Sequence, residues 1–193
     1  MKDKYIFLDR DGVINKDPAG WTEYSYVTRP EDLHILAGVK EAIRKLTDAG
    51  YKVVIISNQQ GVGKGYFTRK DLDEVTRKML EAVKKSGGDI AGVYYCVHAK
   101  EEDCDCRKPK PGLFLKAREE FGIGSFTDMF YIGDTERDIQ AGQKAGLKTI
   151  LVLSGKASRE DVREWGHKPD HICRDLPEAV EVVLSGEVRF SYE

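Results

Sequence analysis

Two carboxylates near the amino terminus, those of Asp9 and Asp11, are separated by one residue and directly follow the apolar stretch 5–8. Like charges at the end of a buried strand repel, and desolvating even one carboxylate is costly unless a cation or a donor compensates. The pair therefore predicts a metal ion that binds a ligand. The alternative is a turn capped by acidic residues in the run Asp-Arg-Asp-Gly.

A second group of potential metal ligands comprises Cys96, His98, Cys104 and Cys106. Three thiolates and one imidazole suit a closed tetrahedral zinc site, which would be structural because no coordination position is left for water. The zinc loop, residues 96–106, has no regular hydrophobic pattern, so we expect Zn²⁺ to order it. The alternative is a flexible loop with unligated cysteines.

Strand and helix patterns alternate along the chain and would position these residues. Expected strands cover residues 4–8, 53–56, 92–95, 129–132 and 149–153, and expected helices lie near residues 39–46, 72–83, 113–121, 138–145, 158–165 and 176–184. The alternation predicts a single α/β domain over residues 1–193, doubly wound and Rossmann-like, with a mostly parallel sheet. A loop and one helix fill the segment between the first two strands, so we expect no cap domain.

Composition limits the possible partners. A hydrophobic content of 40% with 33% charged residues is typical of a soluble globular protein, and a net charge of -2 does not favour nucleic acid or an anionic membrane. No apolar run is long enough to span a bilayer, and the amino terminus lacks a signal-peptide pattern. We therefore expect a cytoplasmic, monomeric protein that binds neither nucleic acid nor membrane.

Polar residues follow three of the expected strands. Asp9 and Asp11 follow the first, Ser57 and Asn58 follow the second, and Asp134 follows the fourth. Because the carboxyl ends of parallel strands meet at one edge of the sheet, where ligands bind in such folds, these residues predict a shared active site.

Four segments in this order resemble the motifs of the haloacid dehalogenase superfamily of phosphohydrolases: Asp9-Arg10-Asp11-Gly12, Ser57-Asn58, Lys108-Pro109-Lys110-Pro111 and residues 133–138. The resemblance covers nearly the whole chain. It implies that Asp9 is the nucleophile that forms an aspartyl-phosphate, and that Asp11 is first general acid and then general base. Ser57 and the backbone at Asn58 would bind phosphoryl oxygens, and Lys108 would neutralise charge on the nucleophile and the phosphate.

The same resemblance implies a catalytic Mg²⁺, which prefers oxygen ligands and needs few protein carboxylates because it keeps several waters. Its expected ligands are the side chains of Asp9 and Asp134 and the carbonyl of Asp11. Asp138 is better interpreted as an orienting residue or a carboxylate at a helix start.

The zinc loop, together with Asp-Arg-Asp-Gly-Val-Ile-Asn and Ser-Asn-Gln, resembles the heptose bisphosphate phosphatases and the related histidinol-phosphate phosphatases. The first group implies removal of the C7 phosphate of D-glycero-D-manno-heptose 1,7-bisphosphate, for the synthesis of lipopolysaccharide-core or surface-layer heptose. A histidinol-phosphate phosphatase of histidine biosynthesis is the alternative. Two further alternatives are a DNA-end phosphatase of the superfamily and a non-catalytic, zinc-stabilised binding module.

Without a cap, specificity must come from loops 15–30 and 59–67 and from the zinc loop. The aromatic residues Trp21, Tyr24 and Tyr26 could line a sugar-sized pocket or could pack the first loop onto the domain.

Cations near the motifs suggest a second phosphate subsite. Lys64 and Arg107 are the candidates for a non-reacting phosphate, and Asn58 and Gln59 are further candidates for substrate binding. Three acidic residues of the first loop could bind the cationic groups of histidinol phosphate, so this substrate remains an alternative: Asp17, Glu23 and Glu31.

Overall fold

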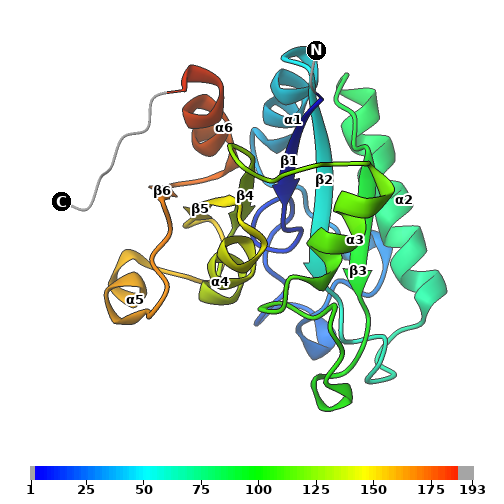
Figure 1. Ribbon diagram of the computed structural model, residues 1–193. Coiled ribbons are helices and arrows are strands. Elements are labelled where there is room, and N and C mark those ends of the chain that lie inside the picture. Colours follow the sequence, from blue (N-terminus) through cyan, green and yellow to red (C-terminus); the bar gives the residue numbers. More distant parts are fainter. Residues whose placement is uncertain (1–2, 187–193) are drawn as a thin grey trace.

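Six short strands, apolar on both faces at their centres, form one sheet in the computed structural model, which describes residues 3–186 (Figure 1). The strands are β1 (Lys4–Leu8), β2 (Tyr51–Asn58), β3 (Gly92–Cys96), β4 (Phe130–Gly133), β5 (Lys148–Val152) and β6 (His171–Cys173). Their order is β3-β2-β1-β4-β5-β6, and every neighbouring pair is parallel. The predicted doubly wound fold is confirmed.

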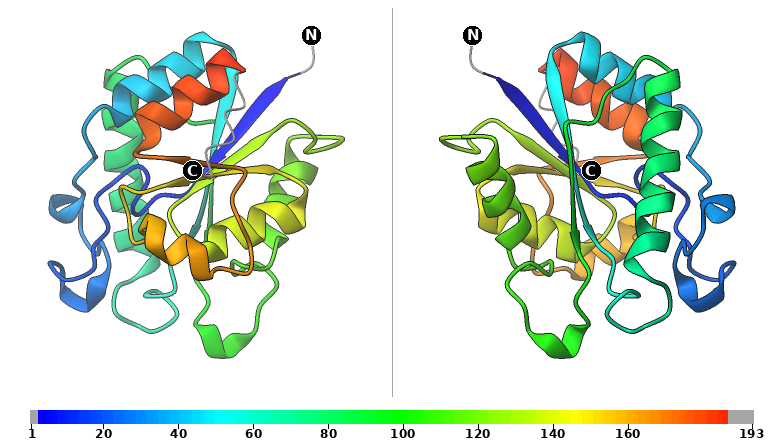
Figure 2. Two further views of the ribbon diagram at one scale, coloured as in Figure 1. Left: turned by 90° about the vertical axis from the view of Figure 1, so that its left-hand side faces the viewer. Right: turned by 90° about the vertical axis from the view of Figure 1, so that its right-hand side faces the viewer.

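Helices cover both faces of this sheet, which explains why the central strands are apolar throughout (Figure 2). The helices are α1 (Val39–Asp48), α2 (Arg69–Lys85), α3 (Gly112–Glu120), α4 (Glu136–Ala145), α5 (Arg159–Glu164) and α6 (Leu176–Ser185). Helices α1, α2 and α6 share one buried cluster with Ile6 and Ile55, whereas α3 and α4 pack on the other face around Phe7 and Tyr131.

The ends of the helices follow local signals in the sequence. Thr68 caps α2 because its hydroxyl accepts a hydrogen bond of 3.2 Å from the N–H of Asp71, and the Asp71 carboxylate accepts one of 2.7 Å from the N–H of Thr68. Gly50 follows α1 with a φ of 80°, a conformation that favours glycine. Both signals depend only on the types of residues at the helix ends.

Strand β6 is the one strand that the sequence pattern did not predict. It spans only three residues, so it is too short to show a periodic pattern. It pairs with β5 from Ile150↔His171 to Val152↔Cys173. The thiol of Cys173 is buried in the core beside α6.

The segment between β1 and β2 contains no cap domain, as predicted. It holds α1 and two single turns of 3₁₀-helix, η1 (Glu23–Ser25) and η2 (Pro30–Asp32). The polar residues that follow β1, β2 and β4 therefore lie at an edge that a separate domain does not cover. The predicted domain, residues 1–193, extends beyond the described residues at both ends. No helix within residues 3–186 is both long and apolar enough to cross a membrane.

Candidate active site

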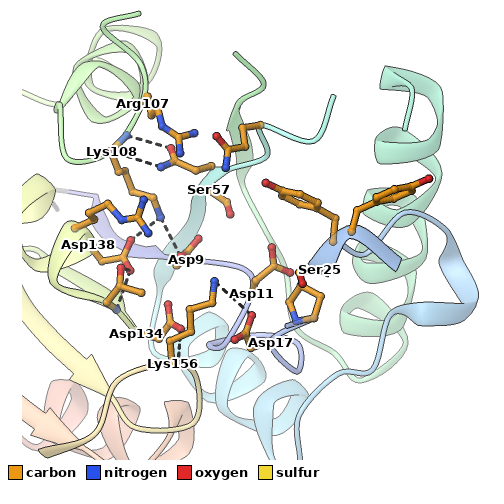
Figure 3. Close-up of a pocket in the computed structure, with 17 residues that line it drawn as sticks. Asp9, Asp11, Asp17, Ser25, Ser57, Arg107, Lys108, Asp134, Asp138 and Lys156 are labelled. Atoms are coloured by element: carbon orange, nitrogen blue, oxygen red, sulfur yellow. Dashed lines mark hydrogen bonds and ion pairs between the residues drawn. The ribbon is translucent and has the colours of Figure 1, made fainter. Parts of the chain in front are cut away.

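The carboxylate of Asp9 lies at the centre of the site, directly after β1 (Figure 3). Its backbone N–H donates to the carbonyl of Ile132 at 2.9 Å, and its Oδ1 accepts a hydrogen bond of 2.7 Å from the N–H of Arg10. Its Oδ2 lies 2.9 Å from Nζ of Lys108. Burial raises the pKa of Asp9 to about 6, although the charge of Lys108 opposes this shift.

Lys108 is a buried lysine with only 3% of its side chain exposed. Its Nζ lies 2.6 Å from Oδ1 of Asp138, 2.8 Å from the hydroxyl of Tyr131 and 3.2 Å from the carbonyl of Ile56. Burial lowers the pKa of Lys108, but the carboxylates of Asp138 and Asp9 outweigh burial and the net shift is upward. The ammonium group is therefore held in its charged form beside Asp9.

Asp138 lies in the first turn of α4, as predicted for a carboxylate at a helix start. Its Oδ2 accepts a hydrogen bond of 3.0 Å from the N–H of Thr135, and its Oδ1 accepts one of 3.0 Å from the hydroxyl of Tyr131. Burial would raise the pKa of Asp138, but Lys108 and the hydroxyl groups of Thr135 and Tyr131 lower it. Asp138 thereby orients the ammonium group of Lys108 beside Asp9. Sequence reasoning missed Tyr131, since a tyrosine in an apolar strand gives no separate signal.

Asp134 follows β4 and approaches two glycines so closely that no side chain fits there. A Cβ at Gly12 would lie 2.3 Å from its Oδ2, and one at Gly155 would lie 2.1 Å from the same atom. Its Oδ2 accepts a hydrogen bond of 2.9 Å from the N–H of Lys156. Burial and the charges of Asp138 and Asp9 raise the pKa of Asp134 well above its ordinary value.

The three carboxylates fit a divalent cation. Oxygen atoms of Asp9, Asp134 and Asp138 lie within 4.8 Å of one another, and Lys108 pairs with Asp9 and Asp138 but not with Asp134. Burial and this excess of negative charge together raise the pKa of Asp134, and a hard cation would offset the charge. Carboxylate oxygens are the donors that Mg²⁺ prefers. The residues present thus fit the predicted magnesium ion.

Residues at the end of β2 and directly after it also form part of the site. Ser57 is buried and lines the cavity beside Asp9. The Asn58 side chain holds the backbone of Lys108, because its Nδ2 donates to the carbonyl at 3.2 Å and its Oδ1 accepts from the N–H at 3.1 Å. Gln59, predicted to bind substrate, is fully buried and donates to Asp11 at 2.8 Å. Its neighbour Gln60 lines the cavity instead.

The cavity above these residues has a volume of about 210 Å³, and its rim includes part of loop 15–30. Tyr24 and Tyr26 line it, whereas Trp21 packs against His34 with ring centroids 5.0 Å apart. Tyr24 also stacks on Tyr66 of loop 59–67 at 4.6 Å. Tyr24 and Tyr26 therefore lie at the cavity, and Tyr24 also joins the first loop to loop 59–67.

The structure brings Arg107 to the cavity but not Lys64. Arg107 lines the cavity, and its Nη1 is buried without a hydrogen-bond partner among the described residues. Lys64 lies outside the lining, with Nζ 5.9 Å from the ring centroid of Tyr66. Arg137 and Lys156 line the cavity as well. Sequence reasoning missed both cations: Arg137 belongs to the motif at residues 133–138 but was given no role, and nothing in the local sequence of Lys156 relates it to the cavity.

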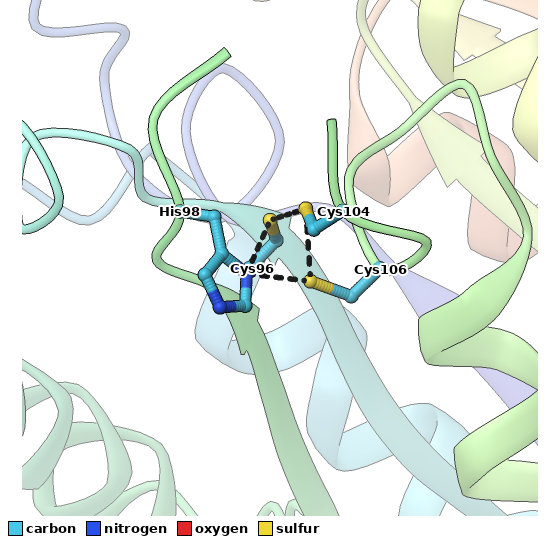
Figure 4. A group of neighbouring side chains, drawn as sticks. All are labelled: Cys96, His98, Cys104 and Cys106. Atoms are coloured by element: carbon cyan, nitrogen blue, oxygen red, sulfur yellow. Dashed lines mark hydrogen bonds between the residues drawn. The ribbon is translucent and has the colours of Figure 1, made fainter. Parts of the chain in front are cut away.

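The predicted zinc ligands converge, although Cys96 ends β3 and the others lie in the loop that follows (Figure 4). The Sγ atom of Cys104 lies 3.5 Å from that of Cys96 and 3.4 Å from that of Cys106, and Nδ1 of His98 lies 3.1 Å from Sγ of Cys106. These separations are too long for disulfides and are close to the roughly 3.8 Å between sulfurs that share a tetrahedral zinc ion. The cluster fits a closed structural zinc site.

Zinc removal is expected to lower both stability and activity, because Cys106 lies two residues before Lys108. We expect Cys106→Ser to lose the bound zinc, to unfold at a lower temperature and to lose roughly tenfold or more in kcat, since a loosened loop misplaces the lysine. Asp105→Asn is the matched control, because the Asp105 side chain is fully exposed in the same loop. Zinc content, unfolding midpoint and kcat are measured together, and a zinc-free variant with unchanged kcat would contradict the link to Lys108.

A parallel α/β sheet whose carboxyl edge presents a buried carboxylate, a lysine paired with it and a site for a hard cation defines a phosphohydrolase of the haloacid dehalogenase superfamily. In agreement, residues 105–179 match the HAD-hydrolase-like family.

Comparison with known proteins narrows this class. The chain is 37% identical over 181 residues to the D-glycero-beta-D-manno-heptose-1,7-bisphosphate 7-phosphatase of Helicobacter pylori, covering 93% of this chain and 97% of that protein. It is 37% identical to the Pasteurella multocida enzyme of the same name, covering 94% and 99%. A crystal structure of the D,D-heptose 1,7-bisphosphate phosphatase from B. bronchiseptica, complexed with magnesium and phosphate, superposes with a TM-score of 0.87 at 32% identity, covering 95% of this chain and 99% of that one.

The chain belongs to the D-glycero-beta-D-manno-heptose-1,7-bisphosphate 7-phosphatase family and is a phosphatase.

Proposed function

We propose that this phosphatase uses Mg²⁺ to remove the C7 phosphate of D-glycero-β-D-manno-heptose 1,7-bisphosphate through an aspartyl-phosphate intermediate. The observation that carries the proposal is the Asp9 carboxylate in the cavity, 2.9 Å from the buried Lys108 and within 4.8 Å of the Asp134 carboxylate. A nucleophile held between an ammonium group and a cation site is the arrangement that phosphoryl transfer requires.

In the first step, an Asp9 oxygen would form a bond to phosphorus while the bond between phosphorus and the C7 oxygen breaks. The leaving oxygen would take a proton from Asp11, whose carboxyl group also lines the cavity. Water would then attack the aspartyl-phosphate and give a proton back to Asp11, which releases phosphate and restores Asp9. Asp9, Asp134 and the Asp11 carbonyl would hold Mg²⁺, which offsets charge on the phosphoryl oxygens.

The heptose substrate is supported by the names of the relatives and by the charges at the cavity rim. The Helicobacter and Pasteurella relatives are named for the β anomer of the bisphosphate. Arg107, Arg137 and Lys156 line the cavity and could bind the second, non-reacting phosphate. The free Nη1 of Arg107 is a donor suited to that phosphate.

Histidinol phosphate is a weaker fit. Of the three acidic residues that kept this substrate open, Asp17 lines the cavity, but Glu23 and Glu31 do not. Oδ1 of Asp17 lies 3.6 Å from Nζ of Lys156, which offsets its charge. Apart from the motif carboxylates and Lys108, the lining holds three cations, Arg107, Arg137 and Lys156, and one carboxylate, Asp17. An ammonium-bearing substrate would not use this excess of cations.

The proposal is tested by phosphate release with Mg²⁺ from the two candidate substrates. We expect kcat/KM for the heptose bisphosphate to exceed that for histidinol phosphate by at least about 100-fold, because two charge-assisted contacts to the second phosphate are each worth roughly 1.5–3 kcal/mol. Analysis of the product would show loss of the C7 phosphate and retention of the C1 phosphate. A preference for histidinol phosphate would contradict the heptose substrate and assign the enzyme to histidine synthesis. The proposed aspartyl-phosphate mechanism would still hold.

Arg107→Ala is expected to raise KM for the heptose bisphosphate about tenfold or more and to change KM for p-nitrophenyl phosphate little, because only the bisphosphate has a second anionic group. Lys64→Ala is the matched control, since Lys64 lies outside the cavity lining. Equal effects of Arg107→Ala on both substrates would count against its role in binding the second phosphate.

The proposal also includes a cytoplasmic enzyme that acts as a monomer. All four cysteines are free, and thiolate metal ligands persist in a reducing compartment. Sedimentation analysis would check the monomeric state.

A further inference from the structure

Arg10 lies between the two acidic residues of the first motif and is the largest fully buried side chain among the described residues. It does not line the cavity, whereas its neighbours Asp9 and Asp11 do. A buried guanidinium group is costly unless it is paired and hydrogen-bonded. The contacts of the Arg10 guanidinium group therefore indicate its role.

The guanidinium group forms an ion pair with the carboxylate of Asp11. Its Nε and Nη2 lie 3.2 Å and 2.9 Å from Oδ1 of Asp11, and Nη2 lies 3.0 Å from Oδ2. The group also lies over the ring of Tyr95 at 5.7 Å from the centroid, and the Tyr95 hydroxyl lies 3.0 Å from Oγ1 of Thr76 on α2. The guanidinium group thus contacts both the Asp11 carboxylate and the Tyr95 ring.

Gln59 completes this support. Its Oε1 accepts a hydrogen bond of 3.2 Å from Nη2 of Arg10, and its Nε2 donates to Oδ2 of Asp11 at 2.8 Å and to Oγ of Ser57 at 3.3 Å. Because Arg10 has only donors, it fixes which end of the amide faces it, and the amino group is left for Asp11. Asn15 adds a hydrogen bond of 2.9 Å to Oδ1 of Asp11.

We propose that Arg10 and Gln59 are positioning residues that hold the Asp11 carboxyl group in place for proton transfer to the leaving oxygen. The inference rests on the proposed function and gives Gln59 a role different from the substrate contact expected from its sequence. A general acid must lie within hydrogen-bond reach of the atom that it protonates, and a displacement of about 1 Å can cost on the order of 100-fold in rate.

If Arg10 and Gln59 position Asp11, the loss of activity on their removal should depend on the leaving group of the substrate. A purely structural role would lower activity on all substrates alike. A sugar alkoxide needs a proton in order to leave, whereas p-nitrophenolate is a stable anion and leaves without one. The parameter kcat/KM covers only the steps up to loss of the leaving group, so the later activation of water does not contribute. Misplacement of Asp11 must therefore lower kcat/KM for the sugar phosphate selectively.

The test compares kcat/KM for the heptose bisphosphate and for p-nitrophenyl phosphate in the full-length protein with Mg²⁺. We expect Arg10→Met and Gln59→Leu to lose about 100-fold and about tenfold, respectively, on the heptose bisphosphate, and less than about threefold on p-nitrophenyl phosphate. Asp11→Asn gives the largest selectivity that loss of the acid can produce. Arg10→Lys should recover part of the loss, because it restores one donor but not the fork.

Arg77→Met is the matched control for removal of an arginine, because Arg77 is exposed and pairs with Glu81 on α2. Equal losses on both substrates in Arg10→Met and Gln59→Leu would overturn the inference, as would no loss on either. If Arg10→Met does not fold, the uncharged exchange Gln59→Leu decides alone. Failure of the proposed function is separate, since it would appear in the wild-type protein as absence of Asp9-dependent phosphate release.

Discussion

Asp9→Asn is expected to abolish phosphate release from the heptose bisphosphate, with a loss in kcat of about 10⁴-fold or more. The amide keeps the shape of the side chain and can still accept the hydrogen bond of 2.7 Å from the N–H of Arg10. It cannot form a stable bond to phosphorus. Rapid acid quenching of a reaction with labelled substrate should yield covalently bound phosphate in the wild-type protein and none in Asp9→Asn.

The fold should survive this exchange. Burial raises the pKa of Asp9 to about 6, above its ordinary value of 3.8, so the charged carboxylate is unfavourable in the folded protein at neutral pH. Without Mg²⁺, the unfolding midpoint of Asp9→Asn at pH 7 should therefore be close to that of the wild-type protein. An inactive variant with a greatly lowered midpoint would leave the nucleophile unassigned, and a variant that retains a tenth of the activity would exclude Asp9 from that role.

Lys108→Met is expected to lower both activity and stability. We expect a loss of roughly 10³-fold in kcat, because the ammonium group that offsets charge at Asp9 is removed from a water-poor site. Removal of one partner of a buried ion pair typically costs about 3–5 kcal/mol of unfolding free energy, and here Asp9 and Asp138 both lose theirs. Lys110→Met is the matched control, since Lys110 belongs to the same motif but is 39% exposed.

The loss of stability in Lys108→Met should depend on pH in a defined direction. Without Lys108, burial and the neighbouring carboxylates would raise the pKa of Asp9 further above its value in the unfolded chain. The folded variant then binds more protons than the unfolded chain, so its stability falls as the pH rises through this range. Denaturant unfolding of Lys108→Met without Mg²⁺ should give a lower free energy at pH 8 than at pH 5, with a larger difference than in the wild-type protein. A flat profile would contradict the account of the charges.

Much of this protein could be predicted from local sequence. Strands β1 and β2 are apolar because both faces of the sheet are covered, and that pattern is visible in the chain. The caps at Thr68 and Gly50 depend only on neighbouring residues. The ligands Cys96, His98, Cys104 and Cys106 were found because soft donors at short spacing have few other uses in a reducing compartment. Strand β6 was missed because three residues carry too little pattern.

The sequence by itself determined the class of fold, the carboxylates at the sheet edge and the zinc ligands, because those depend on periodicity and on residue chemistry at short spacing. Only the tertiary structure decided that Arg10 and Gln59 face Asp11, that Arg107 lines the cavity and that Lys64 does not. Long polar side chains have several rotamers and can reach in many directions, so their partners depend on which distant elements the fold brings within a few ångströms.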